Sequence, residues 1–225
     1  MPPARACTRS ARRSCRVTRI VLLVVALVAM AEAVRPAFAQ DGLYGPGAEP
    51  DAAWIRAVNA RDPGGLGMRL NDGPLLSVAF GDATAYRAVE PGSVPVDLGG
   101  VRLEVDMPGG AFFTVVATGA DPLVIEDEAL IDVSRGLLGL MNLTDRPALT
   151  LATDDGTPVV EDVPPGAHRA VAVAQAEVGL RVEDDAGELG TVEPRLLERG
   201  VAHAVLVVDG PDGPLVRLVA SARAE

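Results

Sequence analysis

Short apolar runs separated by turn residues make up most of the chain after residue 53. Turn sequences such as Asn71-Asp72-Gly73-Pro74 and Asp154-Asp155-Gly156 lie between the runs, and no stretch keeps a helical period. Runs at intervals of 8–12 residues with such turns are typical of a β-sandwich. The sequence therefore predicts an all-β fold, with strands on these apolar runs: 54–58, 75–80, 101–105, 112–117, 123–125, 137–143, 149–152, 171–173, 178–182 and 202–208.

A weak internal repeat divides this part of the chain into two halves. Several segments recur in the same order: 55–59 resembles 138–142, 70–74 parallels 152–158, 90–92 parallels 164–166, and 114–119 parallels 205–210. Chance agreement among common turn residues is the alternative. The repeat predicts two tandem small β-sandwich domains, at 53–126 and 136–225, joined by a short acidic linker at 127–135. A Gly/Pro-rich lead-in, 40–52, precedes them.

The first 39 residues have the pattern of a secretory signal peptide. Six arginines precede an apolar run at 20–31, which is followed by Ala37-Phe38-Ala39. A basic start, a short apolar stretch and a small-x-small site predict cleavage between Ala39 and Gln40. The run is much shorter than the ~20 residues that span a bilayer, which disfavours the alternative of an uncleaved anchor. We expect a periplasmic protein with no direct membrane span after cleavage.

Charge and cysteine content narrow the classes of partner. The formal net charge is −11, and all 20 basic residues are arginines. Cleavage after Ala39 would leave 13 arginines against 30 acidic residues, and it would remove both cysteines, Cys7 and Cys15. A strongly acidic protein is a poor nucleic-acid binder, because phosphate binding needs basic surface. No disulfide is expected to hold the mature domains.

Few residues after the signal peptide could support catalysis. The serines are not in a Gly-x-Ser-x-Gly elbow, and the two histidines are far apart in sequence. We interpret both histidines as structural residues and expect no catalytic residue, no cofactor and no metal site. An acetyltransferase or esterase with an unrecognised Ser–His site remains an alternative, and its residues would come from this set: Ser77, Ser93, Ser134, Ser221, His168 and His203.

Aromatic residues are scarce, at 3% of the chain, so an aromatic platform for stacking sugars is not expected. Tyr44, in the sequence Leu43-Tyr44-Gly45-Pro46, either packs over an edge strand or docks a partner. Trp54 is expected to anchor a core.

Segments spread over the mature chain resemble the alginate biosynthesis protein AlgF family, which is the periplasmic accessory subunit of alginate O-acetylation. The resemblance rests on the order and spacing of short non-catalytic motifs: Leu43-Tyr44-Gly45-Pro46, Phe112-Phe113-Thr114-Val115-Val116, Asn142-Leu143-Thr144-Asp145 and Leu197-Glu198-Arg199-Gly200. It implies two β-sandwich domains and a role in acetylating mannuronate residues. The family's motifs are structural, so no functional residue is carried over.

The resemblance also implies partners. In such systems a membrane-bound O-acyltransferase moves acetyl groups across the inner membrane, and periplasmic acetyltransferases place them on the polymer. A non-catalytic adaptor that acts with these enzymes is the leading hypothesis. The alternatives are the Ser–His enzyme and a module that binds uronate polymers. Tight polymer binding is not expected, because an acidic protein is repelled by a polyanion.

Overall fold

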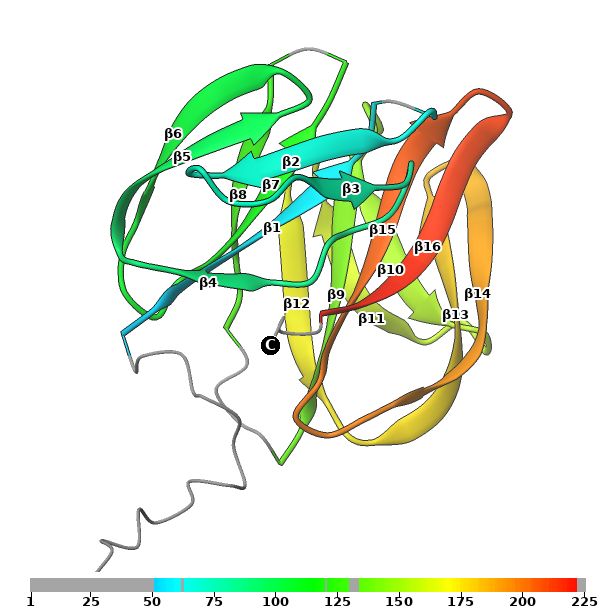
Figure 1. Ribbon diagram of the computed structural model, residues 1–225. Coiled ribbons are helices and arrows are strands. Elements are labelled where there is room, and N and C mark those ends of the chain that lie inside the picture. The colour runs from blue at the N-terminus through cyan, green and yellow to red at the C-terminus, as the bar shows by residue number, and fades with distance from the viewer. Residues whose placement is uncertain (1–50, 62, 120, 130–133, 222–225) are drawn as a thin grey trace, which may run out of the picture. The chain divides into compact units, whose positions relative to one another are not determined.

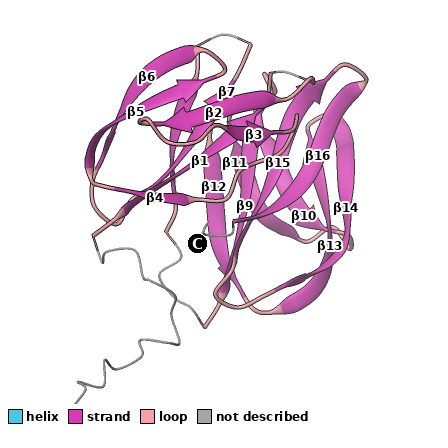
Figure 2. Ribbon diagram, in the orientation of Figure 1, coloured by secondary structure: helices cyan, strands magenta, loops and turns pink. Residues whose placement is uncertain are grey.

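The computed structural model describes residues 51–61, 63–119, 121–129 and 134–221. All the regular secondary structure in these ranges is β-strand (Figures 1 and 2). The predicted all-β class is therefore confirmed. The expected signal peptide, the cleavage residues Ala39 and Gln40, and Tyr44 lie outside the described residues. Within the described ranges, no helix has the length and apolarity needed to cross a bilayer.

The first sandwich has two four-stranded sheets. Its inner sheet has the order β4-β1-β7-β8, and its outer sheet has the order β3-β2-β5-β6. All neighbours are antiparallel except β1 and β7. The strands are β1 (Ala53–Asn59), β2 (Leu66–Leu70), β3 (Leu76–Val78), β4 (Arg87–Val89), β5 (Gly92–Leu98), β6 (Val101–Met107), β7 (Phe112–Ala117) and β8 (Leu123–Asp127).

The second sandwich repeats this topology with every strand number raised by eight. Its inner sheet is β12-β9-β15-β16 and its outer sheet is β11-β10-β13-β14. The parallel pair is again the first and seventh strands, here β9 and β15. The strands are β9 (Gly136–Leu143), β10 (Leu149–Thr153), β11 (Pro158–Val163), β12 (His168–Val173), β13 (Ala176–Asp184), β14 (Gly187–Leu197), β15 (Ala202–Gly210) and β16 (Gly213–Ser221).

Each sandwich has its own apolar core between its two sheets. In the first, Ile55 and Val115 of the inner sheet pack with Met68 and Leu98 of the outer sheet, and all four are almost completely buried. In the second, residues of β9 and β15 pack in the same way against β10 and β13. Alternate residues of a strand point to opposite faces, so these core residues account for only one face of each inner sheet.

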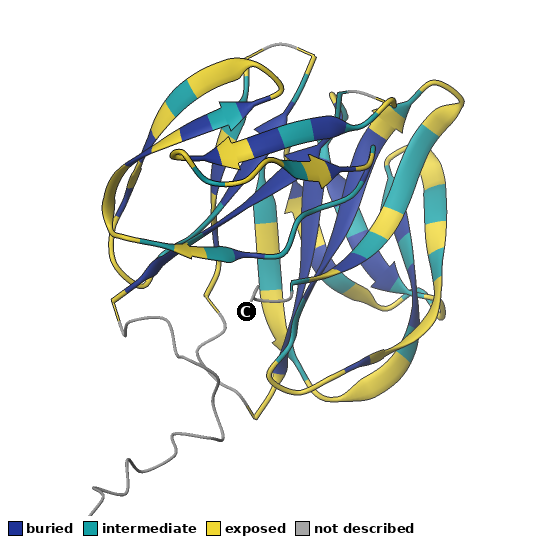
Figure 3. Cartoon of the chain, in the orientation of Figure 1, coloured by how far each residue is buried: buried dark blue, intermediate teal, exposed yellow. Residues whose placement is uncertain are grey.

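The other face of each inner sheet is also covered. A third apolar cluster contains residues of both inner sheets: Val58, Val116, Ile125, Met141, Ala204, Leu206 and Val219. The two inner sheets therefore pack face to face, and the four sheets form consecutive layers within residues 51–221. Central strands such as β9 are buried along nearly their whole length (Figure 3). This explains their continuous apolar sequences, since burial on both faces removes the alternation of polar residues.

One element of the predicted repeat is wrong. The sequence paired turn 90–92 with turn 164–166, but the second of these precedes β12, whose counterpart is β4. The true counterpart of 164–166 is therefore the turn 79–82, before β4. Gly81 and Gly166 each donate their N–H to the carbonyl of the asparagine in β1 or β9, both at 2.8 Å. Their φ angles, +68° and +70°, lie in the left-handed region that favours glycine.

Candidate functional site

A buried polar cluster lies where the two inner sheets meet. It is unusual because charged side chains are rarely buried unless they are paired. Its first four members come from the first sandwich and its last two from the second. We call this set the bridging cluster: Arg56, Tyr86, Thr114, Asp127, His168 and Ser221.

Asp127 is the centre of the cluster. Its Oδ2 accepts hydrogen bonds from Tyr86 Oη, at 2.6 Å, and from Thr114 Oγ1. Its Oδ1 lies 3.7 Å from Arg56 Nη2 and 3.0 Å from His168 Nδ1. The sequence assigned Asp127 to the linker, but it is the last residue of β8, and its side chain is only 2% exposed. A run of acidic residues suggests a linker that is exposed to solvent. Here, however, buried hydrogen-bond donors surround one carboxylate of the run, that of Asp127.

Arg56 connects the two sandwiches. Arg56 is only 1% exposed, and its guanidinium carbon lies 4.6 Å from the centroid of the Tyr86 ring. Nε donates to Thr114 Oγ1 at 2.7 Å, and Nη1 donates across the interface to Ser221 Oγ, also at 2.7 Å. The ring, the two hydroxyls and the Asp127 carboxylate together replace the water that a buried guanidinium loses.

His168 stands at the start of β12, and its side chain is 5% exposed. The distance to Asp127 is that of an ion pair, but the two groups are not aligned for a good hydrogen bond. Gly139 makes room for the imidazole, because a Cβ at this position would overlap His168 Nε2. His168 is therefore seated in a hollow of the second inner sheet and faces a carboxylate of the first.

The surroundings shift two pKa values in the cluster. Burial raises the pKa of Asp127, but His168, Arg56 and Thr114 outweigh this effect and hold the pKa below its ordinary value of 3.8. Burial is also the main cause of a raised pKa for Tyr86; the nearby Asp127 carboxylate adds to it and Arg56 opposes it. The carboxylate is thus kept ionised and the phenol neutral, so Tyr86 stays a hydrogen-bond donor.

The geometry of the cluster bears on the Ser–His alternative. A serine hydrolase needs a serine within hydrogen-bond reach of its histidine, and a carboxylate on the other side. Asp127 and His168 provide the second contact. However, His168 is on β12 and Ser221 is on β16, the opposite edges of a four-stranded sheet. Three strand spacings of about 4.8 Å separate the two strands by roughly 14 Å, and Ser221 is on the rung of Ala172, four residues along the sheet from His168.

Among the other Ser–His candidates, His203 pairs with Ala220, next to Ser221, but side chains alternate along paired strands, so His203 and Ser221 point to opposite faces of the sheet. Ser77 and Ser93 are on β3 and β5 of the first outer sheet, and Ser93 donates to a glutamate of β6 at 2.7 Å. Ser134 lies just before β9, and His203 is buried on β15. As to metals, the part of the chain that the structure describes contains no group of three His, Cys, Asp or Glu side chains able to hold an ion.

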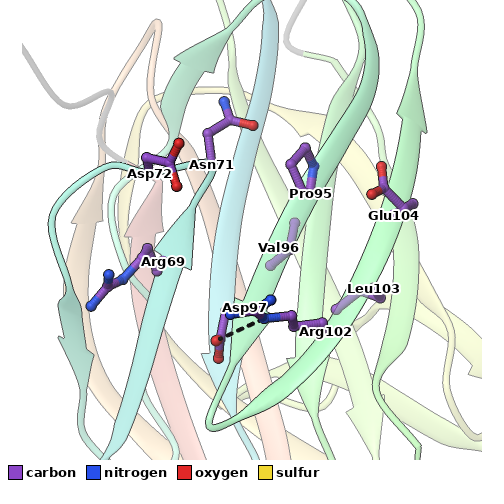
Figure 4. Close-up of a pocket in the computed structure, with 9 residues that line it drawn as sticks. All are labelled: Arg69, Asn71, Asp72, Pro95, Val96, Asp97, Arg102, Leu103 and Glu104. Carbon is purple, nitrogen blue, oxygen red and sulfur yellow. Dashed lines mark ion pairs between the residues drawn. The ribbon is translucent and has the colours of Figure 1, made fainter.

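A shallow hollow of about 560 Å³ lies on the first outer sheet, away from the bridging cluster. Arg69, Asp97 and Arg102 are paired side by side across β2, β5 and β6 in this hollow (Figure 4). Arg102 Nε is 3.7 Å from Asp97 Oδ2, and its side chain is 88% exposed. Asp72 and Glu104 also line the hollow. The charges are therefore mixed and solvated, without a concentration of either sign.

Fold and site together define a tandem β-sandwich protein whose buried charges join its two halves. A family model described as alginate O-acetyl transferase AlgF matches residues 23–204. The chain therefore belongs to the AlgF family, as the sequence motifs indicated.

Individual relatives agree with this assignment. The alginate biosynthesis protein AlgF of Pseudomonas aeruginosa is 29% identical over 178 residues, which cover 78% of this chain and 81% of that protein. The protein of the same name from Pseudomonas fluorescens is 30% identical over 177 residues, which cover 77% of this chain and 80% of that protein.

The chain is also similar to solved structures of the C-terminal and N-terminal domains of AlgF from P. aeruginosa. The match to the C-terminal domain has 28% identity and a TM-score of 0.36, and it covers 39% of this chain and 98% of that domain. The N-terminal domain is 24% identical with a TM-score of 0.32, and it covers 35% and 95%.

Proposed function

We propose that this protein is a non-catalytic periplasmic adaptor for the O-acetylation of mannuronate residues in alginate. Membership of the AlgF family connects the chain to alginate acetylation. In our proposal it acts with a membrane-bound O-acyltransferase and with periplasmic acetyltransferases. The periplasmic location rests on the signal-peptide pattern of residues 1–39, and these partners rest on the resemblance to the family.

The separation of His168 from Ser221 is the observation that best supports a non-catalytic role. The Asp127–His168 pair could orient a general base, but the fold puts the cluster's serine on the far edge of the same sheet. Ser221 Oγ instead accepts a hydrogen bond from Arg56, at 2.7 Å. A buried imidazole without a neighbouring nucleophile is better suited to joining two domains than to acyl transfer.

Charge favours a protein partner over the polymer. After the proposed cleavage, 13 arginines face 30 acidic residues, a net charge of about −17. Alginate is a polyanion, so long-range repulsion opposes its binding. The two arginines of the outer hollow, Arg69 and Arg102, are the observation that favours a polymer-binding module, and three carboxylates share that hollow.

Complementation tests the proposal. We expect deletion of the gene to abolish acetylation of the exported polymer and to leave the polymer itself produced. Acetyl content is measured by proton NMR of the purified polymer. The deletion strain is then complemented with the full chain, or with single alanine variants at the four serines and two histidines after residue 39.

Every variant that reaches the normal level and keeps a native circular dichroism spectrum should restore acetylation. Loss of acetylation in a folded serine variant, together with loss in a folded His168→Ala or His203→Ala variant, would contradict the adaptor role. An acyl-serine detected by mass spectrometry after incubation with an activated acetyl ester would contradict it independently. A mobility shift of alginate that salt removes would favour the polymer-binding module.

A further inference from the structure

The facing surfaces of the two inner sheets occupy equivalent positions in the repeat, but their side chains differ in size and polarity. Arg56 lies three residues before the asparagine of β1, and Gly139 lies three residues before the asparagine of β9. The largest charged side chain of one surface therefore corresponds to a residue with no side chain on the other. Both positions are central in their sheets and fully enclosed by the interface.

The same contrast extends along the rung of residues that crosses each inner sheet here. Arg56 pairs with Thr114 of β7, and Gly139 pairs with Ala204 of β15. Tyr86, one residue before β4, packs against Arg56, whereas Ala170 of β12 pairs with Gly139. At this rung the first sandwich thus presents large polar side chains, and the second presents small residues beside which its own His168 imidazole is seated.

The residues at the ends of the two rungs also hold equivalent positions. Asp127 pairs with Phe112 at the end of β8, and Ser221 pairs with Ala202 at the equivalent position of β16. Arg56 contacts both Asp127 and Ser221, and His168 brings the only imidazole of the cluster to the same carboxylate. The two surfaces, which share one topology, are therefore complementary rather than alike.

We propose that these two surfaces form an intramolecular docking site that holds the sandwiches in a single arrangement. The partner that each surface fits is the other half of the same chain. The apolar cluster between the sheets supplies contact area, and the bridging cluster supplies specificity. A shifted arrangement would leave Arg56 and Asp127 buried without their partners, which is costly. This inference does not depend on the role in acetylation.

Distance measurements between spin labels in the full chain test this proposal. The chain after residue 39 has no cysteine, so labels can be introduced at two chosen positions. Asp106→Cys on β6 and Glu193→Cys on β14 place one label on each outer sheet, and both residues are exposed. We expect pulsed electron resonance to give one narrow distance distribution. A broad distribution in the otherwise unchanged protein would overturn the proposal.

Variants of the cluster provide a second test in the same doubly labelled protein. Asp127→Asn keeps the shape of the side chain and removes its charge, and His168→Ala removes the contact from the other sandwich. We expect either variant, with a native circular dichroism spectrum, to lose the single narrow distribution. The control is Arg217→Ala. Arg217 Nη1 forms an exposed ion pair with Asp82 Oδ2 of the other sandwich, at 3.3 Å, and its removal should leave the distance distribution narrow. A distribution that stays narrow in both folded cluster variants would show that the apolar contact alone fixes the arrangement and would overturn the role of the cluster.

Discussion

Asn59 and Asn142 hold equivalent positions in the two sandwiches and make the same pair of hydrogen bonds. Each is completely buried in the inner sheet. Each side-chain amide donates to the carbonyl of the valine that ends the third strand of its sandwich, at 3.2 and 3.0 Å. Each side-chain oxygen accepts from the N–H two residues further along the chain, at 3.1 Å in both. The two asparagines therefore tie the inner sheet of each sandwich to its outer sheet.

We predict that Asn142→Ala destabilises the protein by roughly 2–4 kcal/mol, because several buried donors and acceptors lose their partner at once. Besides the bonds above, Asn142 donates to the carbonyl of Arg146 at 3.0 Å and accepts from Thr144 Oγ1 at 2.7 Å. Urea unfolding followed by circular dichroism measures the change. Gln175→Ala, at an exposed position between β12 and β13, is the control and should change the stability little.

Gly139→Ala should destabilise the protein by about 1–3 kcal/mol, since the added methyl group has no space beside His168 and Ala170. Gly119→Ala is the matched control, because a Cβ at this glycine meets nothing within 4 Å. Thermal unfolding of both variants measures the difference. Adding His168→Ala should recover part of the loss caused by Gly139→Ala. Strict additivity of the two substitutions would mean that the imidazole does not occupy the hollow.

Asp127 should make the protein less stable in acid. Its pKa in the folded protein is below its ordinary value of 3.8, so its contribution to stability is complete above this value and decreases as the pH falls below it. We expect Asp127→Asn to lower the stability at pH 7 and to flatten the decrease below pH 4. The free energy of unfolding in urea is measured at pH values from 7 to 3. An equally steep acid decrease in the variant would assign the effect to other carboxylates.

His203 should give a second pH dependence, at higher pH. Burial lowers its pKa below 6.5, with a smaller opposing effect of Glu198. The unfolded chain then takes up a proton before the folded protein does, so stability falls as the pH decreases through 6.5 towards the folded-state pKa. His203→Gln removes this group, and we expect the difference in unfolding free energy between pH 7.5 and 5.5 to become smaller. An unchanged difference would contradict the assignment.

Export should remove residues 1–39. The basic start, the apolar run at 20–31 and the sequence Ala37-Phe38-Ala39 predict a mature chain that begins at Gln40. Intact mass spectrometry of the periplasmic protein should match this chain to within one or two residues. Blocking the site with Ala39→Arg should cause the full-length precursor to accumulate. A full-length protein retained in the membrane of the unmodified strain would disprove cleavage.

The strands were predictable from sequence where both of their faces are buried. The apolar run at 112–117 coincides with β7, and the run at 202–208 falls within β15. Strands on the outer sheets were harder to find. In β14, polar residues, two glycines and a proline interrupt the pattern, because most of this edge strand is exposed to water.

The bridging cluster could not be predicted because its members come from distant strands. Thr114 and Asp127 become neighbours through antiparallel pairing, and His168 reaches them only through the packing of the two inner sheets. One local signal was present. Arg56 interrupts the apolar run of β1, and a charged residue inside a strand buried on both faces requires a buried partner.

The layered arrangement of the sheets limits where an acetylation enzyme could bind. β1, β7, β9 and β15 are each enclosed between two layers, so most of their side chains are inaccessible to another protein. An incoming protein within reach of residues 51–221 meets only the two outer sheets, the free strand edges and the connecting loops. Charge-reversal libraries intended to map binding can therefore be restricted to the exposed positions of these elements, and substitutions in the four enclosed strands will report on folding instead.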